Sequence, residues 1–312
     1  MEIIPFDKEI RLPYRPVMTI GMFDGVHIGH QKLLSILKLK AKEYNTKPIV
    51  ITFDKHPQLI LKSENLNNKL GLLQTNEERF EKLRSLDIEE IITIHFTKEF
   101  ASLSAREFIK LLAEKYSPQY LLLGYDNHFG NKSSVEFNDL IQYSKELGII
   151  LERTSDCIFY KDIEVSSTQI RKALSQGNVK LAQAMLNESY VISGKVEQGN
   201  KIGRTLGFPT ANIKVDKYKL LPLFGVYATE VRIEDKEYKG ITNIGNRPTI
   251  NGSQVTIEVN IFNYTGDLYG KKIKISLIDF IREEKKFQDL DELKKQISID
   301  IEKANKIFSI NE

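Results

Sequence analysis

Apolar residues in the first half of the chain follow two different periods. Short apolar runs with the length of strands occupy residues 17–20, 48–53, 88–94, 120–123 and 149–153. Between these runs apolar residues recur every three or four positions, which predicts helices at 30–44, 76–86, 105–116 and 136–147. Strands that alternate with helices of about 10–15 residues indicate βαβ units on a parallel sheet, so we expect an α/β fold for this half.

Ligands bind to such sheets beyond the carboxyl ends of the strands. Three stretches rich in glycine and histidine follow predicted strand ends, at residues 21–30, 53–57 and 124–130. We therefore expect the chemistry of the first half at this edge of the sheet.

The pattern changes after Ser167. Two short helices are expected at 169–174 and 179–186, and from Tyr190 onward the sequence turns to strand-type segments: YVISGKV, GVYATEVRI, KGITNI, VTIEVNIF and KIKISLIDFI. Short strands joined by glycine-containing turns indicate an antiparallel sheet or a small barrel. The stretch 290–308 is a charged amphipathic helix with an apolar stripe at Leu293, Ile297, Ile301 and Ala304. The boundary is expected near Asn187, giving domains 1–186 and 187–312.

Composition narrows the class of protein but not its chemistry. The chain has 312 residues, enough for two domains, with 41% hydrophobic and 28% charged residues. Its apolar runs stay far below the ~20 residues of a membrane span, and the polar start MEIIPFDKEIRLPY does not resemble a signal peptide. A net charge of +3, from 45 basic and 42 acidic residues, gives no electrostatic reason to expect nucleic acid. We expect small-molecule substrates, no membrane partner, and a monomer or weak homo-oligomer.

The single cysteine, Cys157, excludes internal disulfides and cysteine-rich zinc sites and indicates a reducing cytoplasm. A buried structural thiol is favoured over a nucleophile for this residue.

The segment TIGMFDGVHIGHQKLL runs from a predicted strand into a predicted helix. Free backbone N–H groups and the helix dipole favour anions at such a helix start. Gly21, Gly25 and Gly29 let a phosphate approach the backbone. His27 and His30 are able to donate hydrogen bonds to a developing phosphorane. A metal-binding histidine pair and a purely structural turn are the alternatives. The dinucleotide pattern G-x-G-x-x-G is absent, and Asn200 stands where a P-loop would have lysine.

The tetrapeptide HIGH, residues 27–30, resembles the signature of the nucleotidyltransferase superfamily, and the longer GMFDGVHIGHQ is similar to the first motif of prokaryotic FAD synthetase, the bifunctional riboflavin kinase/FMN adenylyltransferase family. VSSTQIR, residues 165–171, is similar to a second motif of that family. The resemblance implies a Rossmann-like nucleotidyltransferase domain in which the FMN phosphate attacks the α-phosphorus of ATP and pyrophosphate leaves. It implies that His27 and His30 stabilise the transition state, that Mg²⁺ bridges the triphosphate, and that the nucleotide is bound by Gly21, Phe23, Asp24, Gly29, Ser167, Thr168 and Arg171.

Alternatives stay open for some of these residues. Ser167 is a possible helix N-cap, and Asp24 either orients the histidine loop or contacts a metal-bound water. A third family motif, GYDNHFG at 124–130, makes Asp126 a nucleotide-binding candidate, with turn capping as its alternative. Here Asn127 replaces an aromatic residue of the family, and Lys55 in TFDKHP replaces a proline, so the activity of this half is the open question.

The second half carries its own candidates. In PTANI, Thr210 and Asn212 are two residues apart, so both side chains share one face of an extended chain, and their oxygens suit Mg²⁺. In TIEVNIF, Glu258 lies on the face opposite Ile257 and Val259 and is either solvent-facing or a general base.

The motifs GRTLGFPTANI, GVYA, NIGNRPT and IEVNIF…DLYG resemble, in order, those of the riboflavin kinase domain, which folds as an antiparallel barrel with a C-terminal helix. The resemblance implies that Thr210 and Asn212 bind Mg·ATP, that Glu258 deprotonates the ribityl 5′-hydroxyl, and that Arg282 lies near the flavin. It also implies an ATP loop lined by Gly194, Lys195, Gly203 and Arg204.

The sequence therefore predicts a cytoplasmic enzyme that converts riboflavin to FMN and FMN to FAD with ATP. Two alternatives remain: a riboflavin kinase with a weakened adenylyltransferase half, and a flavin-responsive binding or regulatory protein.

Overall fold

The computed structural model describes residues 2–57, 71–125, 136–155, 157–199, 203, 206–249 and 252–311, with the backbone alone at 247–249, 252–254 and 311. It divides into two compact units, Met1–Val165 and Ser166–Glu312, which are described here one at a time.

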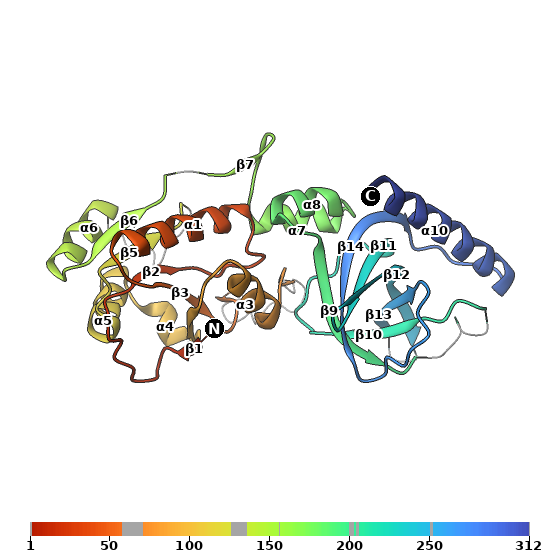
Figure 1. The fold of residues 1–312 in the computed structure, drawn as a ribbon, viewed down its shortest axis with the longest axis horizontal. Coiled ribbons are helices and arrows are strands. Elements are labelled where there is room, and N and C mark those ends of the chain that lie inside the picture. Colours follow the sequence, from red (N-terminus) through yellow and green to blue (C-terminus); the bar gives the residue numbers. More distant parts are fainter. Residues whose placement is uncertain are drawn as a thin grey trace. The chain divides into compact units, whose positions relative to one another are not determined.

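The first unit is built on a six-stranded sheet in the order β1-β4-β3-β2-β5-β6, with every neighbouring pair parallel (Figure 1). The strands are β1 Glu2–Pro5, β2 Val17–Ile20, β3 Pro48–Phe53, β4 Glu90–Ile94, β5 Tyr120–Leu123 and β6 Ile150–Arg153. A short hairpin follows, formed by β7 Phe159–Tyr160 and β8 Ile163–Glu164. The expected parallel α/β fold is confirmed.

Helices pack on both faces of this sheet because successive strand residues point to opposite sides. The helices are α1 Ile28–Glu43, α3 Asn76–Ser85, α4 Lys98–Ser102, α5 Ala105–Tyr116 and α6 Phe137–Glu146. On one face Met18 and Leu121 pack with Phe108 of α5 and Leu140 of α6. On the other face Val17, Val50 and Leu122 pack with Leu34 and Leu37 of α1 and with Leu83 of α3.

Strand β2 marks the switch point of the topology. It lies between β3 and β5, so the chain leaves β2 in one direction and later crosses to its other side. Binding crevices in open α/β sheets form at the carboxyl ends of the strands at such a point. The loop 21–27 therefore starts where the topology places a ligand.

The second unit is a closed antiparallel barrel in the order β10-β13-β12-β11-β14-β9, with helices packed against it (Figure 1). Its strands are β9 Tyr190–Glu197, β10 Ala211–Val215, β11 Gly225–Ile233, β12 Lys236–Thr249, β13 Gly252–Ile261 and β14 Lys272–Glu283. Its helices are α7 Ser167–Ser175, α8 Val179–Leu186 and α10 Leu290–Asn311. Ala304 and Phe308 of α10 pack against Val226 and Ile241 of the barrel, which confirms the predicted barrel with a terminal helix.

Helices α7 and α8 pack against the barrel. The N–H of Leu223 donates to the carbonyl oxygen of Leu174 at 2.8 Å, and Lys180 of α8 pairs with Asp279 of β14 at 2.7 Å. Between the helices, Gly177 has φ +72°, and a Cβ there would lie 3.3 Å from the Phe280 ring. The contacts thus group residues 166–186 with the barrel, whereas the boundary at 187 stays a prediction from sequence.

The boundaries at 166 and 187 predict different stabilities for a truncated chain that contains only the second unit. A chain of residues 166–312 keeps the α7–α8 packing, but a chain of residues 187–312 exposes the apolar surface that these helices cover. We expect the longer chain to be more stable by roughly 2–4 kcal/mol, since each fully buried aliphatic side chain contributes about 1.5–3 kcal/mol. Urea unfolding of both chains measures the difference. Coincident unfolding free energies would contradict this role of the two helices.

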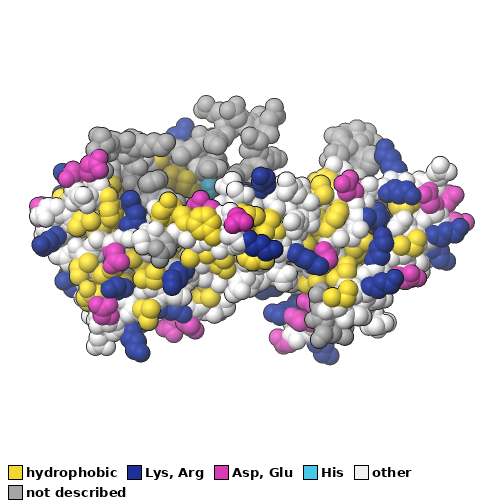
Figure 2. All heavy atoms as spheres, turned by 90° about the horizontal axis from the view of Figure 1, so that it is seen from above, with side chains coloured by type: hydrophobic (Ala, Val, Ile, Leu, Met, Phe, Trp, Pro, Cys, Tyr) yellow, Lys and Arg dark blue, Asp and Glu magenta, His cyan; other side chains and the backbone are white. Residues whose placement is uncertain are grey.

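Charged side chains are mixed over the surface. On the face drawn in Figure 2, Lys and Arg side chains are interspersed with Asp and Glu over the described part, as the balanced composition implies. Within that part of the chain, none of the helices combines the length and the apolar character that a membrane span requires.

Candidate active sites

A strained loop connects β2 to α1 and carries the two histidines. Phe23, Gly25 and Val26 have φ values of +52°, +88° and +39°, and a positive φ at a β-branched residue such as Val26 is a true outlier. The loop is secured by Gln31, whose Nε2 donates to the carbonyl oxygen of Val26 at 2.9 Å. Such strain persists only where surrounding contacts enforce it, and it is common at functional sites.

His27 is the N-cap of α1. Its Nδ1 accepts a hydrogen bond from the N–H of His30 at 3.4 Å, which places the proton of a neutral His27 ring on Nε2. A Cβ at Gly29 would lie 3.2 Å from both Cε1 and Nδ1 of His27. Glycine at position 29 therefore leaves room for the ring.

The rings of His27 and His30 stack, with centroids 3.7 Å apart and planes at 18°, and Phe23 packs 5.1 Å from the His30 centroid. The pKa of His30 is lowered well below its ordinary value. Burial is the main cause, followed by the nearby charges of His27 and Arg79. Its Nδ1 is buried and has no hydrogen-bond partner among the described residues. His30 is thus a neutral ring with one polar atom unsatisfied, as expected for a group that meets a ligand.

Asp24 connects the histidine loop to the segment before α3 through backbone hydrogen bonds. It is buried, and its carboxylate oxygens accept hydrogen bonds from the N–H groups of Leu73 at 3.2 Å and Gln74 at 3.1 Å. Of the two roles considered for Asp24, these contacts favour orientation of the histidine loop.

A small cavity of about 70 Å³ opens beside the histidines. Its walls come from the start of α1, the ends of β5 and β6, and the segment after β8, and they include His27, Gly29, His30, Gly124, Tyr125, Thr154, Cys157 and Val165. The segments that the sequence singled out after β2 and β5 therefore share one cavity. Cys157 is partly exposed there, with Sγ 3.4 Å from Oε1 of Glu164, so the interpretation as a buried thiol is wrong.

Residues of the VSSTQIR motif open α7 in the second unit. The N-cap is Ser166, whose Oγ accepts from the N–H of Gln169 at 3.3 Å, so the N-cap alternative for Ser167 is wrong by one residue. Ser167, Thr168 and Arg171 lie in the first turns of the helix, where free N–H groups favour anions. Asp126 and Arg204 lie outside the described residues.

Glu258 stands in the middle of a polar row across three barrel strands. It pairs in register with Asn212 of β10 on one side and with Asn243 of β12 on the other. Directly opposed side chains on neighbouring antiparallel strands lie within contact distance. The half-buried carboxylate therefore has amide groups on both sides, and Asn243 is a site residue that the sequence analysis missed.

Glu258 and Asn243 of this row line a cavity of about 280 Å³ in the second unit, whereas Asn212 is not among the residues that line it. Its lining combines polar residues (Thr210, Asn243, Glu258 and Asn260), charged residues (Arg282, Glu284, Lys285 and Asp300) and apolar residues (Val226, Ile241, Leu293 and Ile297). Leu293 and Ile297 form an apolar wall contributed by α10. Nδ2 of Asn260 donates to the carbonyl oxygen of Pro209 at 2.8 Å and so fixes the segment before Thr210. A cavity lined by both apolar and polar groups suits an aromatic ring system with a polar tail.

Arg282 borders the same cavity and binds α10. Its Nε lies 3.1 and 2.9 Å from the two carboxylate oxygens of Asp300, and its Nη2 lies 2.8 Å from Oδ2. Asp300 is 1% exposed, so this bidentate pair anchors the helix that forms the apolar wall.

The expected ATP loop is described only in part. A Cβ at Gly194 would lie 2.4 Å from the carbonyl oxygen of Lys214, and one at Gly203 would lie 2.3 Å from that of Phe208, so both glycines permit close backbone approach. Gly203 borders the cavity of about 280 Å³. Lys195 pairs in register with Lys214 and Lys272 and is not among the residues that line this cavity.

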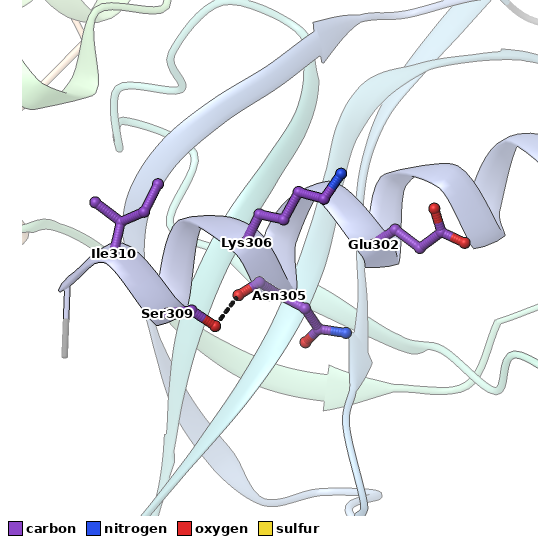
Figure 3. Close-up of a pocket in the computed structure, with 5 residues that line it drawn as sticks. All are labelled: Glu302, Asn305, Lys306, Ser309 and Ile310. Carbon is purple, nitrogen blue, oxygen red and sulfur yellow. Dashed lines mark hydrogen bonds between the residues drawn. The ribbon is translucent and has the colours of Figure 1, made fainter.

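A further hollow lies on the outer face of α10, and Figure 3 shows that its residues all project from this one helix. The interaction drawn there is the bond from Oγ of Ser309 to the carbonyl oxygen of Asn305, at 3.0 Å. This bond is internal to the helix, so the hollow carries no arrangement of catalytic groups.

Comparisons with known proteins cover both units. Residues 10–169 match a family model described as FAD synthetase, and residues 186–308 match one described as riboflavin kinase. Two proteins named bifunctional riboflavin kinase/FMN adenylyltransferase are 38% identical to the chain. The one from Buchnera aphidicola aligns over 95% of this chain and 94% of its own length, and the one from Haemophilus influenzae over 94% of each. A crystal structure from Streptococcus pneumoniae, named as a macrolide-efflux protein, has a TM-score of 0.88 and 31% identity and covers 97% of this chain and 98% of its own.

Proposed function

The chain belongs to the bifunctional riboflavin kinase/FMN adenylyltransferases, and from this premise we propose how its residues divide the two reactions. The enzyme phosphorylates riboflavin with ATP to give FMN, and it adenylylates FMN with ATP to give FAD and pyrophosphate. The matches to both family models favour this reading over a regulatory flavin-binding protein.

The position of Glu258 in the lining of the barrel cavity, with Asn243 and Asn212 in register on either side, is the observation that carries the assignment of the kinase step to this cavity. Glu258 takes the proton of the ribityl 5′-hydroxyl as the hydroxyl oxygen attacks the γ-phosphorus of ATP, and ADP leaves. The apolar wall from α10 holds the flavin ring. Arg282 borders this wall and, through Asp300, keeps α10 in place.

The donor atoms beside Glu258 fit Mg²⁺. Thr210 supplies a hydroxyl and Asn212 an amide oxygen, both hard oxygen donors that suit a cation carrying phosphate and water. When bound, the cation neutralises the charge of the transferring phosphate. Thr210 and Asn212 hold and orient Mg·ATP against the hydroxyl that Glu258 activates.

In the adenylyl transfer, His27 and His30 donate hydrogen bonds to the α-phosphate as the FMN phosphate attacks it. This chemistry rests on positioning and charge stabilisation and requires no covalent intermediate. Ser167, Thr168 and Arg171 bind the triphosphate of ATP. Gly21 and Phe23 belong to the strained loop that Asp24 supports, and Gly29 makes the room that His27 occupies.

Removal of the Thr210 hydroxyl tests the Mg·ATP assignment. In Thr210→Val we expect the Mg²⁺ concentration for half-maximal FMN formation to rise at least roughly tenfold, the usual scale for a weakened metal shell. FAD formation from supplied FMN should keep its Mg²⁺ dependence. Thr265→Val, in an exposed loop of the same unit, is the matched control. An unchanged Mg²⁺ dependence of the kinase step in Thr210→Val would contradict the assignment.

The cytoplasmic location, the absence of a nucleic-acid partner and a monomeric or weakly oligomeric state remain proposals. The cytoplasmic location rests on the single cysteine, and the absence of a nucleic-acid partner rests on the balanced charge.

A further inference from the structure

Arg79 is a buried cation behind the histidine loop. It lies on α3 and is 3% exposed. An arginine in a surface helix normally extends into solvent, and a buried one is retained where its donors have specific partners. The partners of Arg79 therefore show what this residue does.

The guanidinium joins the ends of two adjacent strands. Its Nη1 donates to the carbonyl oxygen of Met22 at 2.9 Å, just after β2, and its Nη2 donates to that of Phe53 at 2.6 Å, at the end of β3. Nη2 also lies 3.0 Å from Oδ1 of Asn76. Met22 directly precedes Phe23, the first residue of positive φ in the strained loop. Arg79 thus fixes the backbone at the point where the strain begins.

The charge of Arg79 also acts on His30. Burial lowers the pKa of Arg79 to about 10 against the opposing effect of Asp24 and Asp54, so the side chain is still a cation at neutral pH. That cation is one of the causes that keep the pKa of His30 low. Among the described residues, the other titratable groups around His30 are its stacked neighbour His27 and, along the same cavity, Lys32, Tyr125, Cys157 and Glu164.

We propose that Arg79 is a positioning residue of the adenylyltransferase step, which holds the histidine loop in its strained conformation before substrate binds. The proposal rests on the proposed role of His27 and His30. Among the described residues, the hydrogen bonds of the guanidinium go to Met22, Phe53 and Asn76, and its Nε is buried without a partner. These contacts act on the loop and on the end of β3, so the role proposed for Arg79 is positioning. Its planar fork reaches two carbonyl groups at once, which the single ammonium of lysine does less well.

The test compares Arg79→Met and Arg79→Lys with Arg84→Met, an exposed arginine on the same helix. In Arg79→Met we expect kcat for FAD formation from FMN to fall about 100-fold, the scale of a small misplacement of catalytic groups. The KM for ATP should change much less. Arg79→Lys should recover part of the rate, and Arg84→Met and the kinase step should be unaffected.

A second readout separates positioning from general stability. The His30 ring is titrated by NMR in the substrate-free full-length protein, with its resonance assigned from His30→Asn. Removal of a nearby positive charge makes protonation easier, so the pKa of His30 should rise in Arg79→Met toward the ordinary value of about 6.5. In Arg79→Lys it should stay low.

The proposal fails if the pKa of His30 is the same in Arg79→Met and the native protein, or if kcat falls only in proportion to the fraction of unfolded protein. The titration needs no catalysis, so it judges Arg79 separately from the proposed function. An active His30→Ala enzyme would instead overturn the role of the histidines.

Discussion

Glu258→Gln is expected to reduce FMN formation roughly 10²–10⁴-fold, the contribution typical of a positioned general base. Glutamine keeps the size of the side chain and its place between Asn212 and Asn243, but it cannot accept the proton of the ribityl hydroxyl. FAD formation from supplied FMN takes place without this carboxylate and should continue at the native rate. Chromatographic separation of riboflavin, FMN and FAD measures both steps in one reaction.

Glu237→Gln is the control, because Glu237 is an exposed carboxylate of the same barrel that pairs with Arg232. It should leave both steps unchanged. A native rate of FMN formation in Glu258→Gln would contradict the assignment of Glu258 as the general base. Loss of both steps with a folded protein would show that the two reactions share this residue.

His30→Ala should have the opposite effect, with FAD formation reduced roughly 10²–10³-fold, as for the loss of one donor to a developing charge. FMN should then accumulate from riboflavin at the native rate. Because His30 is packed between His27 and Phe23, alanine also leaves a space there, so His30→Asn serves as a second variant that fills more of it. Both variants should lose the adenylyltransferase step.

His95→Ala is the matched control, since His95 also follows a strand of the sheet but is mostly exposed and contacts Asp54 at 2.6 Å. Native FAD formation is expected in this variant. If His30→Ala and His30→Asn still form FAD at the native rate while His95→Ala does not, the catalytic histidine has been assigned to the wrong loop.

Much of the fold could be predicted from local periodicity. The strands 17–20, 48–53 and 120–123 and the helices 105–116 and 179–186 have the predicted bounds, because each has a clear apolar period and a clear end signal. Strand β1 was missed. With a single buried residue, Ile4, it adds to the sheet beside β4 and shows no alternation of its own. Pairing of this kind depends on the partner strand and not on the sequence of β1.

The candidate site residues also fall into two groups, those that a sequence motif identifies and those that only the tertiary structure reveals. His27, His30 and Glu258 stand in contiguous motifs and could be selected from sequence, although their roles stay proposals. Arg79 could not be found, because in the sequence it is one charged residue among many on α3 and resembles part of a solvated face. Its burial arises from the meeting of α3 with the ends of β2 and β3, and only the tertiary structure shows this.

The adjacency of the residues in the polar row could not be predicted from the sequence either. Asn212, Asn243 and Glu258 come from three separate strands, so their adjacency follows from strand register. Periodicity within one strand indicates which face a side chain occupies, but it does not indicate which residue lies opposite.

The closure of the barrel also limits how Glu258 can move. Strand β13 pairs with β10 on one side and with β12 on the other, so it has no free edge from which to peel away. A slip of one residue would turn the carboxylate to the opposite face and would require both ladders to break together. Opening at this position is therefore tied to cooperative unfolding of the barrel. The topology of the barrel therefore keeps the proposed base rigid.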